Sequence, residues 1–377
     1  MKIFIIFFFL ITIFLKSEVS LFKNNTFKCD TTKFYMPIKV SSYDFKTGKI
    51  VCIQDTKVKS EKVRNSYISS SLGRSSHPKT ALLYELNGYT TLTTNGIYRD
   101  SFDDASYAKI DDKVIIVSGS QKVGVWNSES IQMENLYQHN NHFMIGKVYP
   151  YKNKIFASGY STLLIDSSKT CVMVNFESSK YEENTLEEVS FKGFYDISKF
   201  QKNYKIRDLI KTEEPFMKRH IEFLNTASIF ANSNYALKKD NFFVINCFGA
   251  EILEYDYDLN ILNKFGLDEI VKLRDIELGD LTDINQLKGN KRASSVTNFF
   301  HNDNNNTFII QYKFSKFMQE NGYPETEIFI FSIDKNKIID RFPFKGDING
   351  YDPTKNRISI LNNIDDSTFE VEIYEIK

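Results

Sequence analysis

The chain has 377 residues, of which 42% are hydrophobic and 25% are charged, with 48 basic and 48 acidic side chains. This length suffices for one large hydrophobic core or two ordinary ones. The balanced charge, which is not gathered into basic blocks, argues against nucleic-acid binding, and only 7 prolines and 16 glycines argue against a disordered or linker-rich chain.

The N-terminal segment has the composition of a signal peptide. Lys2 precedes the run Ile3–Leu15, in which Thr12 is the only polar residue. Such a run is too short to span about 30 Å of hydrocarbon comfortably. We therefore predict a signal peptide over residues 1–17, cleaved between residues 17 and 20, with an uncleaved anchor as the alternative. The mature protein is expected to be periplasmic, on the cell surface or secreted, without a later membrane span.

Four cysteines occur at positions 29, 52, 171 and 247, and in an exported chain an even number permits disulfides. Cys29 and Cys52 are the only close pair, whereas Cys247 lies in an apolar run and is expected to be a buried free thiol. No Cys-x-x-Cys spacing occurs. The sequence therefore predicts no zinc site and no other metal ligand.

A hairpin pattern recurs along the chain: an aromatic strand end, a polar turn with Asn, Asp or Gly, and then at least three residues of a second apolar strand. The six copies are Tyr43–Ile53, Tyr107–Val117, Tyr149–Ala157, Tyr235–Ile245, His301–Gln311 and Tyr351–Leu361. Further strands follow most copies. The clearest case is a meander within Tyr235–Leu267, with strands over Phe242–Asn246, Glu251–Tyr257 and Ile261–Phe265.

The second half of the chain contains two further strand signals. Asp334-Lys335-Asn336-Lys337 separates two apolar runs and predicts a hairpin turn. Near the C-terminus, Phe369, Val371 and Ile373 alternate with polar residues, which is typical of a half-buried strand. Two stretches have helical spacing instead, Lys205–Thr226 and Asp268–Leu287, and are interpreted as insertions between strands.

Many short strands and sheet-sized repeats without βαβ alternation favour a β-propeller, an all-β fold that leaves few exposed sheet edges. The chain resembles the exported six-bladed propellers of the TolB-like and NHL-like kind found in Bacteroidetes. The residues that carry the resemblance are Asn241–Asp256 and Asn349–Leu361. The spacing of the expected strands resembles that of these propellers over residues 30–377. The resemblance implies a fold and no particular chemistry.

We therefore predict a single β-propeller domain over residues 30–377, with six blades, or seven as the alternative, and short helical insertions. A pair of β-sandwiches is the second choice of fold. Residues 177–222 contain no clear repeat, so either one blade is degenerate or a seventh lies there. Phe34–Val40 is predicted to be the N-terminal strand that completes the last blade and closes the ring.

Three motif-like segments receive structural interpretations. Gly119–Gly124 lacks the lysine of a phosphate-binding loop and is read as a hairpin turn. Asp256, Asp258 and Asn260 have the first oxygen spacing of a calcium loop but lack its later glycine and glutamate, so they too predict a turn. His139 and His142 have no third ligand nearby and are interpreted as loop residues.

No serine-hydrolase elbow and no dinucleotide fingerprint occur. The sequence thus identifies no catalytic residue and no cofactor, and it assigns no binding residue. We expect a monomeric, non-catalytic binding or scaffold protein that recognises a protein, peptide or glycan partner through loops at one face. The alternative is a hydrolase or lyase in which acidic and histidine residues of different blades meet at the channel mouth.

Overall fold

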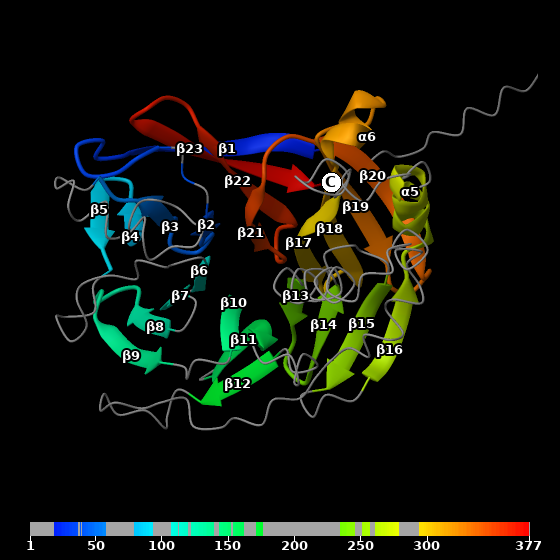
Figure 1. Ribbon diagram of the computed structural model, residues 1–377, viewed down its shortest axis with the longest axis horizontal. Coiled ribbons are helices and arrows are strands. Elements are labelled where there is room, and N and C mark those ends of the chain that lie inside the picture. The colour runs from blue at the N-terminus through cyan, green and yellow to red at the C-terminus, as the bar shows by residue number, and fades with distance from the viewer. Residues whose placement is uncertain are drawn as a thin grey trace, which may run out of the picture.

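The strands of this protein are grouped into sheets that stand around a common centre (Figure 1). The computed structural model describes residues 19–36, 38, 40–57, 79–92, 107–111, 113–119, 122–138, 143–151, 154–161, 171–175, 234–245, 251–256, 261–278 and 294–376. Neighbouring strands within every sheet are antiparallel. Radially arranged antiparallel sheets define a β-propeller.

The sheets follow one another along the chain, each listed here from its innermost strand outward. The first contains β2 (Val40–Tyr43), β3 (Ile50–Asp55), β4 (Lys79–Glu85) and β5 (Gly88–Thr91). The second contains β6 (Tyr107–Asp111), β7 (Val114–Ser118), β8 (Lys122–Asn127) and β9 (Met133–Gln138). The third contains β10 (Phe143–Tyr151), β11 (Lys154–Ser161) and β12 (Cys171–Asn175).

The fourth sheet contains β13 (Asn234–Leu237), β14 (Asn241–Ile245), β15 (Glu251–Asp256) and β16 (Ile261–Gly266). The fifth contains β17 (Ser295–Asn302), β18 (Thr307–Lys313), β19 (Thr326–Ser332) and β20 (Lys337–Phe344). The last contains β21 (Ile348–Asp352), β22 (Arg357–Asn363), β23 (Thr368–Ile376) and, outermost, β1 (Val19–Lys28).

Each predicted hairpin repeat forms the two innermost strands of one sheet, which confirms the repeat and the propeller fold. The predicted turn residues Gly48, Asn306 and Asn356 have φ angles of +72°, +51° and +49°. Glycine and asparagine adopt this left-handed conformation at the lowest cost among the residues. At these three hairpins the turn chemistry of the sequence therefore specifies where the chain reverses.

The number of blades differs from the prediction. Five sheets have four strands and the sheet β10–β11–β12 has three, so five complete blades are described rather than six or seven. A fourth strand following β12 would have to come from residues 176–233, which lie outside the described residues, as does the predicted helix Lys205–Thr226. The prediction of six blades is therefore not confirmed.

The ring is closed by a different strand from the one predicted. β1 pairs with β23 along its whole length, from Val19 opposite Ile376 to Lys28 opposite Thr368, and it lies ahead of residue 30, where the sequence starts the propeller. The prediction that Phe34–Val40 is the closing strand was wrong, because Phe34 makes only an isolated β-bridge, to Thr56.

Phe34–Val40 does not continue the closing strand β1 because the chain turns at Asp30. The Asp30 carboxylate accepts hydrogen bonds from the backbone N–H of Thr32 at 3.0 Å, from the Thr32 hydroxyl at 2.5 Å and from the Tyr89 hydroxyl at 2.9 Å. These bonds, led by that of the Thr32 side chain, lower the pKa of Asp30 to about 2. An aspartate that bonds to the backbone two residues later ends an extended strand.

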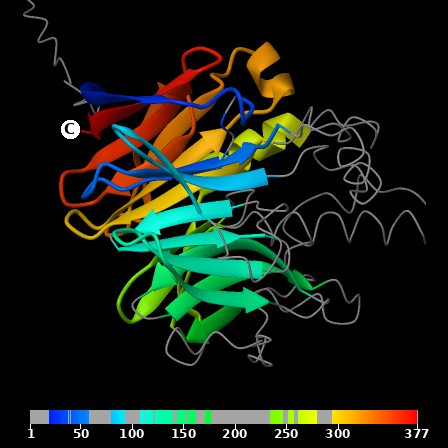
Figure 2. The ribbon, with the colours of Figure 1, turned by 90° about the vertical axis from the view of Figure 1, so that its left-hand side faces the viewer.

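Both described helices belong to connections that leave the same face of the propeller, opposite the tight turns (Figure 2). α5 (Asp268–Leu278) lies between β16 and β17 and buries Ile270 and Leu273, which confirms the predicted helix over its described part. α6 (Lys316–Glu320) lies between β18 and β19 and is capped by the Ser315 side chain. Within the described chain, no helix combines the length and apolarity that a bilayer crossing requires.

The hydrophobic core consists of layers between adjacent sheets. Phe308 of β18 is fully buried, with ring centroids of Phe243 at 4.8 Å, Phe299 at 5.1 Å and Phe331 at 6.1 Å. At the ring closure, Phe27 of β1 stacks on Phe369 at 5.2 Å. Aromatic pairs at such distances add to the stabilisation from buried area.

Candidate functional site in the central cavity

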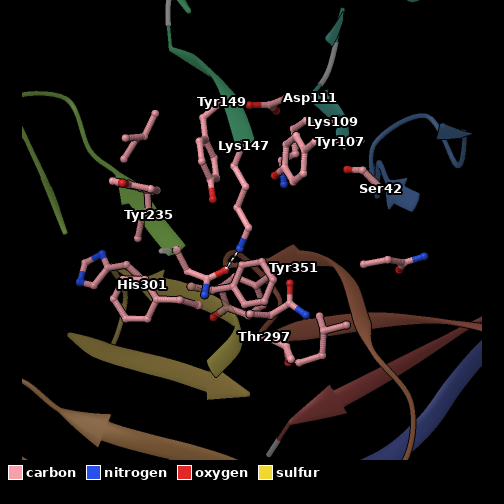
Figure 3. A pocket seen from close by; sticks show the side chains of 18 of the residues that line it. Ser42, Tyr107, Lys109, Asp111, Lys147, Tyr149, Tyr235, Thr297, His301 and Tyr351 are labelled. Atoms are coloured by element: carbon pink, nitrogen blue, oxygen red, sulfur yellow. Dashed lines mark hydrogen bonds between the residues drawn. The ribbon is translucent and has the colours of Figure 1, made fainter. Parts of the chain in front are cut away.

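The innermost strands of all six sheets line one central cavity of about 490 Å³ (Figure 3). Alternation along these strands decides what the cavity contains. In β6, Ala108 and Ile110 are buried between sheets, whereas Tyr107, Lys109 and Asp111 are more exposed. Successive residues of a strand point to opposite faces, so one strand supplies both core and cavity wall.

Three tyrosines form an aromatic wall of the cavity. The ring centroids of Tyr107 and Tyr149 are 6.0 Å apart, and those of Tyr149 and Tyr235 are 5.6 Å apart. Burial raises the pKa of Tyr107, opposed by a hydrogen bond with Tyr149, so its phenol is neutral at physiological pH. These rings come from β6, β10 and β13. Tyr235 is almost completely buried in the core with Phe242 and Tyr255, so Tyr107 and Tyr149 provide the neutral surface against which a planar group can stack.

Two lysines reach the cavity from neighbouring strands. Lys147 of β10 donates a hydrogen bond of 2.5 Å to the Asn234 side chain of β13. Lys109 of β6 is half-buried, and its ammonium makes no hydrogen bond or ion pair to any described residue. Burial lowers the pKa of Lys109, and the nearby carboxylates of Asp111 and Asp44 only partly oppose this effect.

The two carboxylates that line the cavity lie at its rim. Asp111 is exposed, and the Asp303 side chain is 68% exposed. Asp303 is also engaged, because the Lys238 ammonium lies 2.9 Å from its carboxylate and the His301 Nδ1 lies 3.3 Å from it. Its charge is therefore largely balanced by Lys238.

His301 belongs to both the core and the cavity wall. Its side chain is only 4% exposed and packs against the rings of Phe243 and Phe308, with centroids at 5.2 and 5.3 Å. Burial and then the Lys238 charge lower the pKa of His301, and the Asp303 charge opposes them. The imidazole is therefore neutral at pH 7.

Hydrogen bonds between sheets hold the cavity wall together. The backbone N–H of Ile110 donates to the Ser42 hydroxyl at 3.3 Å, and the Asn349 side chain donates to the Ser41 hydroxyl at 3.1 Å. The Asn234 side chain donates to the Val296 carbonyl oxygen at 3.2 Å. Many amides and hydroxyls of the wall are thus engaged in joining blades.

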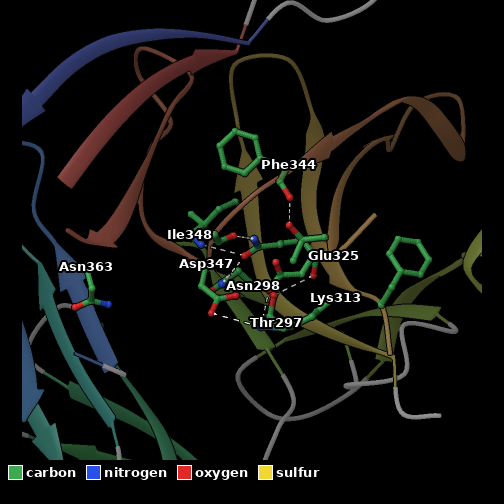
Figure 4. A network of polar contacts seen from close by, with 12 residues as sticks. Thr297, Asn298, Lys313, Glu325, Phe344, Asp347, Ile348 and Asn363 are labelled. Carbon is green, nitrogen blue, oxygen red and sulfur yellow. Dashed lines mark hydrogen bonds and ion pairs between the residues drawn. The ribbon is translucent and has the colours of Figure 1, made fainter. Parts of the chain in front are cut away.

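Gln311 connects the fifth sheet to the last one through hydrogen bonds that include Asn298 and Ile348, two residues of the polar network in Figure 4. Its side-chain oxygen accepts from Asn298 at 2.9 Å and from the Ile348 backbone N–H at 3.0 Å, and its nitrogen donates to the Gly346 carbonyl oxygen at 2.6 Å. Gln311 is completely buried. A buried amide with all three of these bonds made fixes β21 relative to β17.

None of the described residues of the motif-like segments lines this site. Gly119–Gly124 spans the hairpin between β7 and β8, as predicted, and Asp256 ends β15 before the hairpin to β16. His139, His142, Asp258 and Asn260 lie outside the described residues, as does Cys247. Cys29 and Cys52 are buried free thiols. In the described part of the chain, no three His, Cys, Asp or Glu side chains are grouped as a metal site requires.

The sequence assigned no binding residue. One signal was nevertheless present, because an aromatic residue begins every repeat. Of these markers, Tyr43 faces the core, where its hydroxyl accepts from Asn25 at 3.0 Å. The other five line the cavity: Tyr107, Tyr149, Tyr235, His301 and Tyr351.

Comparisons with known proteins agree with the fold. The chain is similar to the crystal structure of a DUF4221 family member from Bacteroides vulgatus, with a TM-score of 0.52 and 10% identity, covering 96% of this chain and 99% of that one. A luciferin-regenerating enzyme follows with a TM-score of 0.43 and 10% identity, covering 94% of this chain and 95% of that one. A chain of the mitotic checkpoint complex has a TM-score of 0.42 and 8% identity, and the match covers 93% of this chain and 90% of that one.

At 10% identity such a likeness shows a shared fold and nothing about activity. No protein-family model and no curated protein sequence matches the chain. The TolB-like or NHL-like type that the sequence predicts is accordingly not confirmed.

Proposed function

We propose that this protein is a non-catalytic binding propeller that takes its ligand in the central cavity. The observation that carries the proposal is a cavity of about 490 Å³ to which every innermost strand contributes side chains. Small-molecule sites usually have about 300–1,000 Å³ and a few polar groups on largely preformed walls. The predicted partners are glycans and short peptides. A cavity of this size can hold one sugar residue of a glycan or one side chain of a peptide.

The wall favours binding over chemistry. Its two carboxylates come from different blades, Asp111 at the end of β6 and Asp303 in the turn after β17, and Asp303 is balanced by Lys238. Hydrolases and lyases need an acid and a base that converge on one substrate bond. The aromatic wall and the two lysines instead provide stacking and charge.

The test is a ligand panel of oligosaccharides, short peptides and divalent metals against the thermal unfolding of three proteins. Thr297→Phe fills the cavity from β17, and Thr90→Phe makes the same change on exposed β5 outside it. A ligand at about a hundred times its Kd stabilises the native state by about 2.7 kcal/mol. We expect a shift in the wild type and in Thr90→Phe but not in Thr297→Phe. A shift that persists in Thr297→Phe, or no shift at all, contradicts binding in the cavity.

A hydrolase or lyase is the second candidate function, and one observation favours it. His301 Nδ1 lies 3.3 Å from the Asp303 carboxylate, and both residues line the cavity. A neutral imidazole beside a carboxylate is the arrangement of a general base. Turnover of a glycan or peptide by the wild type, with loss of turnover in His301→Gln, would establish this function in place of simple binding.

We also propose that the three-stranded sheet β10–β11–β12 is the sixth blade of a six-bladed propeller of the TolB-like or NHL-like kind, and that the chain is exported. Cleavage after Ser17 would leave β1, which starts at Val19, intact. Mass spectrometry of the protein from cell envelope or medium is expected to find an N-terminus between residues 18 and 21. A mature protein that still begins at Met1 would contradict cleavage.

A further inference from the structure

The cavity has an uneven distribution of charge. Its two cations, Lys109 and Lys147, are half-buried, whereas its two carboxylates, Asp111 and Asp303, are exposed at the rim. Lys238 lies 2.9 Å from Asp303 and balances its charge. His301, the remaining charged or titratable group of the wall besides the tyrosines, is neutral because burial lowers its pKa. The interior of the cavity is therefore positive.

Lys109 and Lys147 differ in how well their charges are satisfied. Lys147 donates to Asn234 at 2.5 Å. The Lys109 ammonium has no described hydrogen-bond or ion-pair partner, and the nearby Asp44 carboxylate already accepts from the backbone N–H groups of Lys46 and Thr47. Among the described residues, the charges of Asp111 and Asp44 only partly compensate for the hydration that this half-buried ammonium loses. An anion beside it would restore the lost interaction.

The surroundings of Lys109 define the rest of the ligand. Tyr107 lies two residues away on the same strand, and its ring centroid is 6.0 Å from that of Tyr149, whose centroid is 5.6 Å from that of Tyr235. Figure 3 shows these tyrosines and both lysines pointing into the same cavity. A ligand with an anionic group at Lys109 therefore meets a row of neutral rings along one wall.

We propose that the central cavity binds a small organic carboxylate whose body is a ring: the carboxylate pairs with Lys109 and the ring packs against Tyr107 and Tyr149. The inference rests on the proposed function, because it names the ligand chemistry of the same cavity. A sugar acid and an aromatic acid share this chemistry. The exposed Asp111 carboxylate repels further negative charge, so the site selects a single anionic group on an otherwise neutral body.

Calorimetric titrations with matched acid and neutral probes test the proposal and distinguish the two sources. Glucuronate is compared with glucose, and benzoate with benzyl alcohol, each against the wild type, Lys109→Met and Lys113→Met. Methionine preserves the apolar stem of Lys109 without its charge. Lys113 is 61% exposed beside β7 and outside the cavity, so Lys113→Met makes the same change in net charge in the same blade.

The expected result is that one acid binds the wild type and Lys113→Met, that its neutral partner does not, and that Lys109→Met binds it at least about tenfold more weakly. Equal binding of an acid and its neutral partner, unchanged affinity in Lys109→Met, or no binding of either acid to the wild type would overturn the proposal. If a neutral ligand binds and Thr297→Phe abolishes that binding, the proposed function still holds and only the ligand chemistry is wrong.

Discussion

The two faces of the innermost strands have opposite character. Between sheets, side chains such as Ile110 of β6 and Val296 of β17 are almost completely buried among apolar neighbours. On the cavity side of the same strands lie Tyr107, Tyr149 and Lys109, whose ammonium has no hydrogen-bond or ion-pair partner among the described residues. Proteins place strained or incompletely satisfied groups where binding requires them and stabilise the fold elsewhere. We conclude that stability and ligand binding are separable residue by residue in this propeller.

The largest expected effect tests the core side. Removal of residues 1–28 deletes β1, exposes the edge of β23 and takes Phe27 away from Phe369. We expect the free energy of unfolding to fall by more than about 3 kcal/mol, the lower cost of deleting one buried phenylalanine. The exposed edge should also cause self-association. Chemical denaturation and light scattering measure the two effects.

Removal of residues 1–18 is the matched control for this truncation, since it leaves β1 whole. It should leave both the free energy of unfolding and the light scattering unchanged. If the two truncated proteins were equally stable, β1 would not close the ring.

A smaller effect tests how closely the innermost strands approach each other. A Cβ on Gly350 of β21 would lie 2.7 Å from the Tyr43 carbonyl oxygen of β2 and 2.6 Å from the Ser359 hydroxyl. Gly350→Ala must therefore separate the first and last blades, and we expect a loss of about 1–3 kcal/mol in unfolding free energy. In Gly266→Ala the new Cβ would be 3.5 Å from its nearest neighbour, so unfolding should change by no more than about 0.5 kcal/mol. Equal losses of unfolding free energy in both variants would show that Gly350 and Tyr43 are not tightly packed.

The smallest expected effect concerns His301, because its side chain packs in the core and also lines the cavity. Burial first and Lys238 second lower its pKa, while Asp303 and Glu254 oppose them. The unfolded chain, with an ordinary histidine, thus binds more protons as the pH falls below about 6.5, so native stability decreases there. The slope is limited to about 1.4 kcal/mol per pH unit for one proton.

His301→Phe keeps a ring between Phe243 and Phe308 but cannot titrate. We expect denaturation between pH 5 and pH 8 to show a weaker pH dependence in this variant than in the wild type. An identical dependence in both proteins would mean that protonation of His301 is not what destabilises the fold in acid.

Much of the fold could be predicted because its signals are local. Gly48, Asn306 and Asn356 identify tight turns through their own conformational preferences, and the alternation at Phe369, Val371 and Ile373 matches their burial in β23. Ring closure could not be read in this way. The apolar residues of Phe34–Val40 look more like a strand than the polar centre of β1, Lys23–Thr26, whose pairing depends on the distant C-terminus.

The site was harder to predict, for a geometric reason. The pattern of Tyr107, Lys109 and Asp111 against Ala108 and Ile110 shows two faces, but both solvent and a central cavity produce such a pattern. Only the position of β6 as the innermost strand decides between them. The aromatic marker of each repeat was therefore visible in the sequence, but its place on the cavity wall was not.

The most direct test compares two neighbouring residues on opposite faces of β6, Lys109 and Ile110. Denaturation and titration with the acid found to bind are measured for Lys109→Met and for Ile110→Val. We expect Lys109→Met to keep or slightly raise the stability and to lose at least about tenfold in affinity. Ile110→Val should lose about 0.5–1.5 kcal/mol of stability and keep its affinity. If stability and affinity fell together in both variants, the two faces of the strand would not be separable and the account would be wrong.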